Sequence, residues 1–351
     1  MFDASALMES PPLVSVCVPT YNYARFLPDC IESVLEQSIS DWELIICDDA
    51  SVDDTENVVR RYAAHDPRIR YLRNTQRLGM NGNLKHAADC GTAKYLKILC
   101  ADDWIAPNCL AVLCALMESY PSAAIATCAE IHTNAIGEAQ RVQFLFGEPV
   151  TFIAGDEMLD RISRGEGGGG NSSFVIRAAA YHRVGGYDAR RPYAGDYDLL
   201  ARLCAVGDYV HTDQPLFYGR SQPDSSSARN PKLLLDVRDW YDVPATVFEP
   251  RHLGDRNWRR FTRRRRELTA RYLLNILLEH CRGNHAYAQE LRKIILAKGS
   301  LMLGIPWLVV HVPRRLYNRI TGADKPLSRP VEAWMGTPSS LRLRRDRDRD
   351  A

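Results

Sequence analysis

Short apolar runs alternate with amphipathic segments over residues 13–119 of this chain. The apolar runs include "LVSVCV", "ELIIC", "RIRYL" and "KYLKIL", and segments such as "RFLPDCIESVLEQS" between them carry apolar residues at helical spacing. Strands that alternate with helices form a mainly parallel sheet with right-handed crossovers and helices on both faces. We therefore predict an α/β fold whose ligands bind at the carboxyl ends of the strands.

Polar side chains follow three of these runs directly. They are the segment Pro19–Tyr23, the pair Asp48 and Asp49, and the pair Asp102 and Asp103, and one crevice could gather them all. Adjacent carboxylates after a buried strand need either water or a cation, and Mg²⁺ typically takes one or two protein carboxylates beside phosphates and water. Helix capping is the alternative interpretation of each acidic pair.

Cysteine usage and apolar run length exclude several protein classes. The ten cysteines are scattered without a CxxC pair, which predicts neither a zinc site nor a disulfide framework and favours a reducing cytoplasm. The start "MFDASALMES" lacks the features of a signal peptide, and no run of apolar residues is long enough to span a bilayer. We expect a cytoplasmic protein that is neither secreted nor membrane-spanning.

The pattern changes near Asp236, where the chain becomes helical and rich in arginine. We predict an N-terminal tail (1–12), an α/β domain (13–235), a basic helical appendage (236–322) and a disordered tail (323–351). The run "RRFTRRRREL" lacks a nucleic-acid-binding motif and interleaved stacking aromatics, so we expect a solvated face and no nucleic-acid partner.

Within the appendage, residues Gly299–Val312 contain Trp307 but no lysine, arginine or acid, and Arg314 and Arg315 follow. This pattern fits an interfacial helix whose arginines meet anionic lipid headgroups, which would give peripheral contact with the inner face of the cell membrane. The alternative is a buried helix that packs on the α/β domain.

Four segments taken in order, "SVCVPTYN", "ELIICDDASVDDT", "NTQRLGMNGNLKHAADCGTAKYLKILCADDW" and "GGYDARRPYAGDYDLLARL", resemble the nucleotide-sugar glycosyltransferases of family two. The resemblance covers residues 13–227 and implies the GT-A fold, which is Rossmann-like. It implies that Pro19 and Tyr21 line the nucleotide pocket and that Asp48 or Asp49 contacts the base. It also places Asn83 among the residues that bind the nucleotide sugar.

The segment "ADD" resembles the DXD-type element of this family. The resemblance implies that Asp103 is the ligand of a Mg²⁺ or Mn²⁺ ion, with Asp102 nearer the sugar. Gln222 stands where many relatives carry a histidine near the metal, and an amide oxygen is a poorer cation ligand. The neighbouring Arg220 is expected to neutralise charge on the diphosphate.

The segment "GDYDLLARL" resembles the family's "EDYDLWLRL". The first aspartate of that motif serves as general base, which implies Asp196 here, with Asp198 as the alternative. Gly195 replaces the family's glutamate. The other interpretation of Asp196 is a simple helix cap.

The resemblance implies an inverting, metal-dependent transferase of polysaccharide assembly in the cell envelope. It would move a sugar from a UDP-, GDP- or dTDP-sugar donor to a glycan or lipid-linked glycan acceptor. Gly195 and Gln222, which depart from the family pattern, motivate a different class as the alternative, a non-catalytic binding or scaffold protein.

Overall fold

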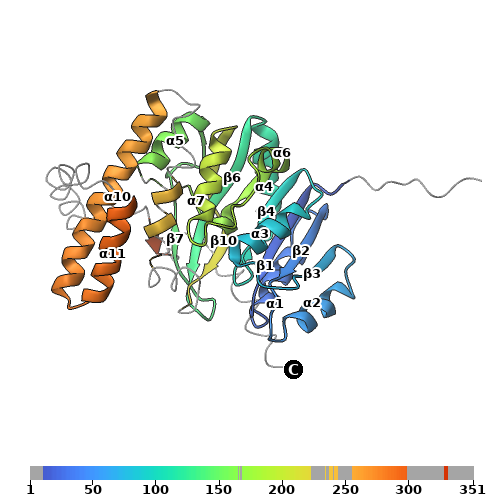
Figure 1. Ribbon diagram of the computed structural model, residues 1–351. Coiled ribbons are helices and arrows are strands. Elements are labelled where there is room, and N and C mark those ends of the chain that lie inside the picture. Colours follow the sequence, from blue (N-terminus) through green and yellow to red (C-terminus); the bar gives the residue numbers. More distant parts are fainter. Residues whose placement is uncertain are drawn as a thin grey trace, which may run out of the picture.

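The computed structural model describes residues 11–164, 166, 168–222, 234, 237–239, 241–243, 255–298 and 328–330. Strands and helices alternate through the first half, as the sequence predicts, and Figure 1 shows their arrangement. The strands are β1 (Val14–Thr20), β2 (Trp42–Asp48), β3 (Ile69–Arg73), β4 (Tyr95–Ile98), β5 (Trp104–Ile105), β6 (Ala123–Thr133), β7 (Ala139–Gln143), β8 (Val150–Ile153), β9 (Val175–Arg177), β10 (Asp208–Arg220) and β11 (Ser328–Pro330). The helices are α1 (Leu27–Leu35), α2 (Thr55–Ala63), α3 (Met80–Asp89), α4 (Cys109–Ser119), α5 (Gly155–Ser163), α6 (Ala178–Arg183), α7 (Gly195–Cys204), α10 (Asp255–Cys281) and α11 (His285–Lys298), with a 3₁₀ turn, η1, at Asn171–Ser173.

The strands form one sheet in the order β11-β7-β6-β9-β4-β1-β2-β3, and β10 pairs with β5, β6 and β8. The first four strands are parallel to one another, which matches the prediction. Beyond β4 the sheet is mixed, because β9 runs antiparallel between β4 and β6 while β10 is parallel to β6. The α/β fold class is therefore confirmed, and the parallel pairing describes mainly its N-terminal half.

The register of the parallel strands aligns their carboxyl ends. Thr20 at the end of β1 lies opposite Asp48 at the end of β2, and Asp48 lies opposite Arg73 at the end of β3. The chain that follows each strand therefore starts from the same edge of the sheet. This alignment brings residues that are far apart in sequence into one region.

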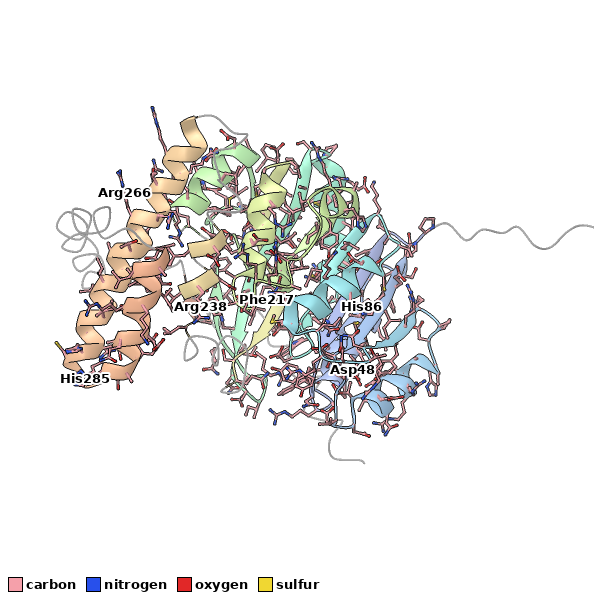
Figure 2. The ribbon with its side chains drawn as sticks, in the orientation of Figure 1. Asp48, His86, Phe217, Arg238, Arg266 and His285 are labelled. Atoms are coloured by element: carbon pink, nitrogen blue, oxygen red, sulfur yellow. The ribbon has the colours of Figure 1, made fainter. Side chains whose placement is uncertain are left out.

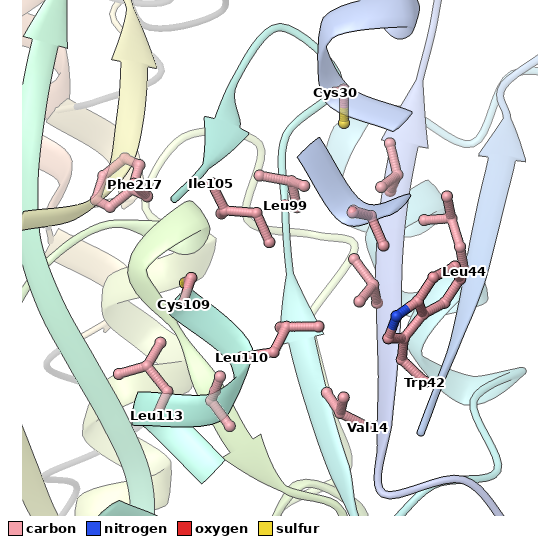
Figure 3. Close-up of a cluster of buried hydrophobic side chains, with 14 of the residues drawn as sticks. Val14, Cys30, Trp42, Leu44, Leu99, Ile105, Cys109, Leu110, Leu113 and Phe217 are labelled. Atoms are coloured by element: carbon pink, nitrogen blue, oxygen red, sulfur yellow. The ribbon is translucent and has the colours of Figure 1, made fainter. Parts of the chain in front are cut away.

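The core lies on both faces of the sheet. Val16 and Val18 of β1 belong to a buried cluster with α1, α2 and α4, whereas Cys17 between them belongs to a second cluster with α3, α5 and α7. Figure 3 shows part of the first cluster, with Leu110 and Leu113 of α4. Because successive strand residues face opposite sides, a strand buried on both faces must be continuously apolar, which explains the runs in the sequence.

Helices α10 and α11 pack against each other and form a separate buried cluster that includes Leu268 and Leu291. The arginine-rich helix is joined to α5 by Arg260, whose guanidinium lies 2.9 Å from Asp156 and 2.7 Å from Asp160. Arg260 is only 2% exposed, so this arginine is not part of a solvated face.

Two predictions about the C-terminal third concern residues that lie mostly outside the described ranges. The predicted interfacial helix lies outside them, and no helix within the described ranges is long and apolar enough to cross a membrane. The predicted disordered tail, 323–351, does not hold for Ser328–Pro330, because their backbone pairs with β7 as strand β11.

Candidate functional site

A pocket of about 440 Å³ opens beside the carboxyl ends of β4, β6 and β10. Two of the predicted site residues, Asp103 and Asp196, line it together. Figure 2 labels a third lining residue, Phe217, as well as Asp48 at the end of β2, which does not line the pocket. The remaining lining residues are Met80, Asn81, Cys100, Glu130, Gly168, Gly169, Gly170, Asn171, Ser172, Pro192, Tyr193, Ala194, Tyr197 and Leu200.

Asp102 and Asp103 form a turn between β4 and β5. Asp103 accepts hydrogen bonds from the Ser172 hydroxyl at 2.6 Å and from the backbone N–H of Arg220 at 2.9 Å. Asp102 accepts a hydrogen bond from the Gln222 amide at 2.5 Å. Helix α4 begins only at Cys109, so the helix-cap interpretation of this acidic pair is wrong.

Burial raises the pKa of both carboxyls, and the charge of Asp102 raises the pKa of Asp103 further. A divalent cation would relieve this cost, since it holds carboxylates in their ionised form. Each oxygen of Asp103 accepts one protein hydrogen bond, which leaves lone pairs for a hard cation. The described residues hold no cluster of three metal-binding side chains, so a cation here would take its other ligands from phosphate and water.

The guanidinium of Arg220 fixes this turn. It lies 2.7 Å from Asp29, and it donates to the carbonyl oxygens of Asp102 at 3.0 Å and Ala135 at 3.1 Å. The rings of Phe26 and Trp104 lie on it, with centroids 4.9 and 4.8 Å away. Arg220 is therefore tied to protein groups, and its contact with a diphosphate stays a prediction.

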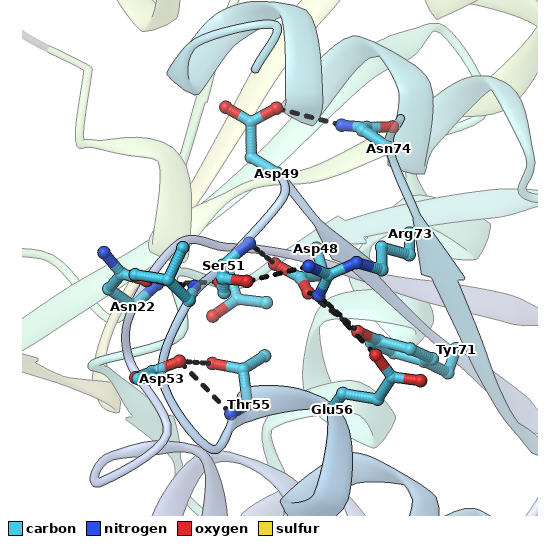
Figure 4. A network of polar contacts seen from close by, with 12 residues as sticks. Asn22, Asp48, Asp49, Ser51, Asp53, Thr55, Glu56, Tyr71, Arg73 and Asn74 are labelled. Carbon is cyan, nitrogen blue, oxygen red and sulfur yellow. Dashed lines mark hydrogen bonds and ion pairs between the residues drawn. The ribbon is translucent and has the colours of Figure 1, made fainter. Parts of the chain in front are cut away.

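Asp48 and Asp49 are buried at the end of β2 and serve the neighbouring loops (Figure 4). Asp48 accepts hydrogen bonds from the Ser51 N–H at 2.9 Å and the Tyr71 hydroxyl at 2.7 Å, and its carboxylate pairs with Arg73 at 2.7 Å. Helix α2 begins at Thr55, so neither acid caps it.

The carboxylate of Asp49 organises the loop that leads into α3. It accepts hydrogen bonds from the backbone N–H groups of Leu78 at 2.7 Å and Gly79 at 2.9 Å, and from the Asn74 amide at 3.0 Å. The same loop carries Arg77, whose guanidinium lies 3.7 Å from the centroid of the Tyr21 ring. The contact between a base and these acids stays a prediction.

Asn83 holds the ends of two strands together. Its amide donates to the carbonyl oxygens of Cys47 at 2.7 Å and Thr20 at 3.4 Å, and its oxygen accepts from Asn74 at 2.9 Å. Asn83 is 2% exposed, and Pro19 lies within β1 beside these groups. Contact of Asn83 and Pro19 with a nucleotide stays a prediction.

Asp196 lies in the first turn of α7, after the N-cap residue Ala194. Its carboxylate accepts the Tyr197 N–H at 2.8 Å, and burial raises its pKa. Because α7 begins before Asp196, the helix-cap interpretation is wrong. The alternative base, Asp198, is fully buried, forms an ion pair with Arg202 at 2.5 Å, and does not line the pocket.

The start of α7 is held from outside by Asp239, whose carboxylate accepts the N–H groups of Tyr193 at 2.7 Å and Ala194 at 2.9 Å. Gly195 lies in close contact with the Asn81 side chain. A β-carbon at this position would overlap the carboxamide of Asn81, which packs against it and donates to the carbonyl oxygen of Arg191. A glutamate at this position would therefore require the Asn81 side chain to move.

Sequence reasoning missed Glu130, a third acid of the pocket. Burial raises its pKa to about 7. His132, whose Nε2 contacts the Gln143 side-chain oxygen at 2.9 Å, turns Nδ1 toward Glu130 at 3.2 Å. Burial lowers the pKa of His132, and neutral His132 with its proton on Nε2 leaves Nδ1 as an acceptor for protonated Glu130. A single glutamate in an apolar strand carries no sequence signal for such a role.

Comparisons with known proteins identify the family of this chain. The family described as "Glycosyl transferase family 2" matches residues 15–184. The putative glycosyltransferase EpsE of Bacillus subtilis is 32% identical over 219 residues, which cover 60% of this chain and 73% of EpsE. The chondroitin synthase of Escherichia coli is 27% identical over 210 residues, and the match spans 60% of this chain but only 29% of that protein.

Among solved structures, the mannosyltransferase PcManGT of Pyrobaculum calidifontis, in complex with GDP-Man and Mn²⁺, has a similar fold. Its TM-score is 0.55 at 17% identity, over 89% of this chain and 82% of that one. At this identity the likeness concerns the fold alone. The match to the family model and the match to EpsE lead to one conclusion: the chain belongs to glycosyltransferase family 2.

Proposed function

We propose that this enzyme transfers a sugar with inversion from a nucleoside diphosphate donor to a hydroxyl of a glycan or lipid-linked glycan. The observation that carries the proposal is that Asp103 and Asp196, predicted as metal ligand and general base, line the same pocket. A donor diphosphate bound near Asp103 would leave its sugar within the pocket, between the two acids.

Asp196 is the base in this proposal. It takes the proton of the acceptor hydroxyl as that oxygen forms a bond to the anomeric carbon, and the bond from this carbon to the diphosphate oxygen breaks. Attack on the face opposite the leaving group inverts the anomeric centre. Asp198 is the weaker candidate, because one of its carboxylate oxygens is paired with Arg202 and the residue is fully buried outside the pocket.

Asp103, with Asp102 beside it, would hold a Mg²⁺ or Mn²⁺ ion, which when bound supplies charge neutralisation for the departing diphosphate. Buried carboxylates with raised pKa values and oxygen donors suit such a cation. The PcManGT structure, which contains Mn²⁺ and GDP-Man, supports a divalent cation and a nucleotide-sugar donor.

The acceptor proposal rests on the relatives. The E. coli relative carries the name chondroitin synthase, which supports a glycan acceptor, although this chain spans only 29% of that protein. A UDP-, GDP- or dTDP-sugar remains the donor class. Its nucleobase would lie near Tyr21 and Asp49. The 4.0 Å contact between Arg77 and Asp49 lies beside Tyr21 and supports that location.

The test compares Asp196→Asn with Asp198→Asn. A screen of nucleotide sugars with Mn²⁺ first identifies the donor by its hydrolysis or transfer. We expect Asp196→Asn to bind this donor normally and to lose about a hundred- to ten-thousand-fold in transfer rate. Near-normal transfer by this variant, with loss in Asp198→Asn, would move the role to Asp198. Near-normal transfer by both would refute the mechanism.

A further inference from the structure

Two asparagines that line the pocket each have a side-chain polar group that bonds to no described residue. Asn81, in the first turn of α3, is 4% exposed and lines the pocket. Its amide N–H donates to the Arg191 carbonyl oxygen, which fixes the orientation of the carboxamide. The side-chain oxygen of Asn81 accepts no hydrogen bond from any residue that the structure describes. An acceptor is therefore available beside Gly195 and Asp196.

Asn171, in the turn η1, is the complementary case. It is 8% exposed and lines the same pocket. The hydroxyl of Tyr187 donates to its side-chain oxygen at 2.6 Å, so the orientation of this amide is also fixed. Within the described part of the chain, no acceptor takes a hydrogen bond from the Asn171 side-chain nitrogen. This donor lies next to Ser172, the residue whose hydroxyl binds Asp103.

Neither group is a fully buried, unsatisfied atom, and both residues line the pocket, so water or a ligand there can bond to each group. Here the two groups are neutral, opposite in hydrogen-bonding sense and held by other residues before any ligand binds. One stands on the side of Asp196 and the other on the side of Asp103. Neutral amides of fixed orientation suit the hydroxyl groups of a sugar, which both donate and accept.

We infer that Asn81 and Asn171 recognise the transferred sugar and determine which sugar the enzyme accepts. A sugar hydroxyl donates to the Asn81 oxygen, and a sugar oxygen accepts from the Asn171 nitrogen. Tyr187 is a positioning residue, because its hydroxyl keeps the Asn171 nitrogen directed to the ligand. This inference rests on the proposed function and specifies the sugar subsite of the same pocket.

Steric coupling supports the role of Asn81. The carboxamide occupies the space that any β-carbon at Gly195 would need, and it is anchored on the loop that precedes α7. The side chain is thus built into the wall next to the proposed base. A residue that only filled space here would not require an amide, and a leucine-sized apolar group would leave the Arg191 carbonyl oxygen without its donor.

The experiment measures two dissociation constants for each protein by calorimetry with Mn²⁺. One is for the intact nucleotide sugar that the wild type binds most tightly in a screen, and the other is for its nucleoside diphosphate alone. We expect Asn81→Ala and Asn171→Ala each to weaken the nucleotide sugar about tenfold or more, with the nucleoside diphosphate unchanged. Tyr187→Phe should weaken the nucleotide sugar in the same selective way.

Tyr95→Phe is the matched control for Tyr187→Phe. Tyr95 is also fully buried and its hydroxyl donates to the Glu118 carboxylate at 2.9 Å, but it does not line the pocket. This control should leave both dissociation constants unchanged. Equal weakening of the nucleotide sugar in Tyr95→Phe and Tyr187→Phe would mean a general loss of structure and would overturn the positioning role.

Other outcomes separate this inference from the proposed function. If the wild type binds no nucleotide sugar, the proposed function itself fails. If the wild type binds one and the asparagine variants keep its affinity, only the sugar subsite fails. A change confined to the KM of the acceptor would assign Asn81 and Asn171 to the acceptor sugar and would overturn the assignment to the transferred sugar.

Discussion

Replacing Glu130 by glutamine should make the protein more stable above neutral pH. The side chain keeps its size but cannot ionise. In the wild type, burial raises the pKa of Glu130 from the ordinary 4.5 to about 7, so the ionised form is unfavourable in the folded state. Because the folded protein then binds more protons than the unfolded chain, stability falls as pH rises from about 4.5 to about 7.

The size of the effect follows from the two pKa values. At about 1.4 kcal/mol for each pH unit, the wild type loses up to about 3.5 kcal/mol of unfolding free energy across this interval. Neighbouring groups modify this effect. Arg141 lowers the pKa of Glu130, burial lowers the pKa of the adjacent His132, and the charge of Glu130 raises the pKa of Asp103. The coupling to Asp103 requires its own control.

The assay is thermal and urea unfolding between pH 4 and 8.5 in EDTA, for wild type and Glu130→Gln. We expect the stability difference to grow from pH 4.5 to 7 in favour of the variant and then to stay constant. The same comparison in an Asp103→Asn background removes the coupling, and the exposed Glu148→Gln is the matched control. Parallel stability curves for wild type and Glu130→Gln would refute the account of a buried, protonated acid.

Three further predictions follow from the site and the appendage. Asp103→Ala should abolish the metal-dependent part of nucleoside diphosphate binding in calorimetry. If wild type and variant bind equally well with metal present, Asp102 takes the role of metal ligand. Arg260→Met should cost about 1–3 kcal/mol in urea unfolding and expose α10 to limited proteolysis, because two α5 aspartates lose their partner; an unchanged protein would mean that α10 docks without this contact. Residues 299–315 should bind anionic liposomes in a salt-sensitive way that weakens when Arg314 and Arg315 become glutamine, and equal recovery with neutral liposomes would contradict an interfacial helix.

The N-terminal half of the fold could be predicted because its signals are local. The apolar runs of β1 to β4 and the turn residues after them determine the strands and the edge on which Asp48 and Asp102 lie. The other half could not, because the pairing of β10 with β6 joins Val210 to Ala126 across a long stretch of chain. A local pattern does not reveal which distant strand becomes the neighbour, or its direction.

The site divides in the same way. Asp103 and Asp196 stand in recognisable motifs at strand and helix ends, and the structure brings them to one pocket. Glu130, Asn81 and Asn171 sit inside ordinary elements, and their importance depends on which groups surround them after folding. The unused hydrogen-bonding groups of the two asparagines and the raised pKa of Glu130 arise only in the folded pocket.

Hydrogen bonds from the end of β10 to Asp102 and Asp103 affect the order in which this region forms during synthesis. Asp102 and Asp103 leave the ribosome long before Arg220 and Gln222, which supply their hydrogen bonds. Since chains are made at about 5–20 residues per second, the two acids spend several seconds as a solvated pair without these partners. The nascent N-terminal half can therefore form its parallel strands early, but Asp102 and Asp103 gain these hydrogen bonds only after β10 has been made and has paired with β6.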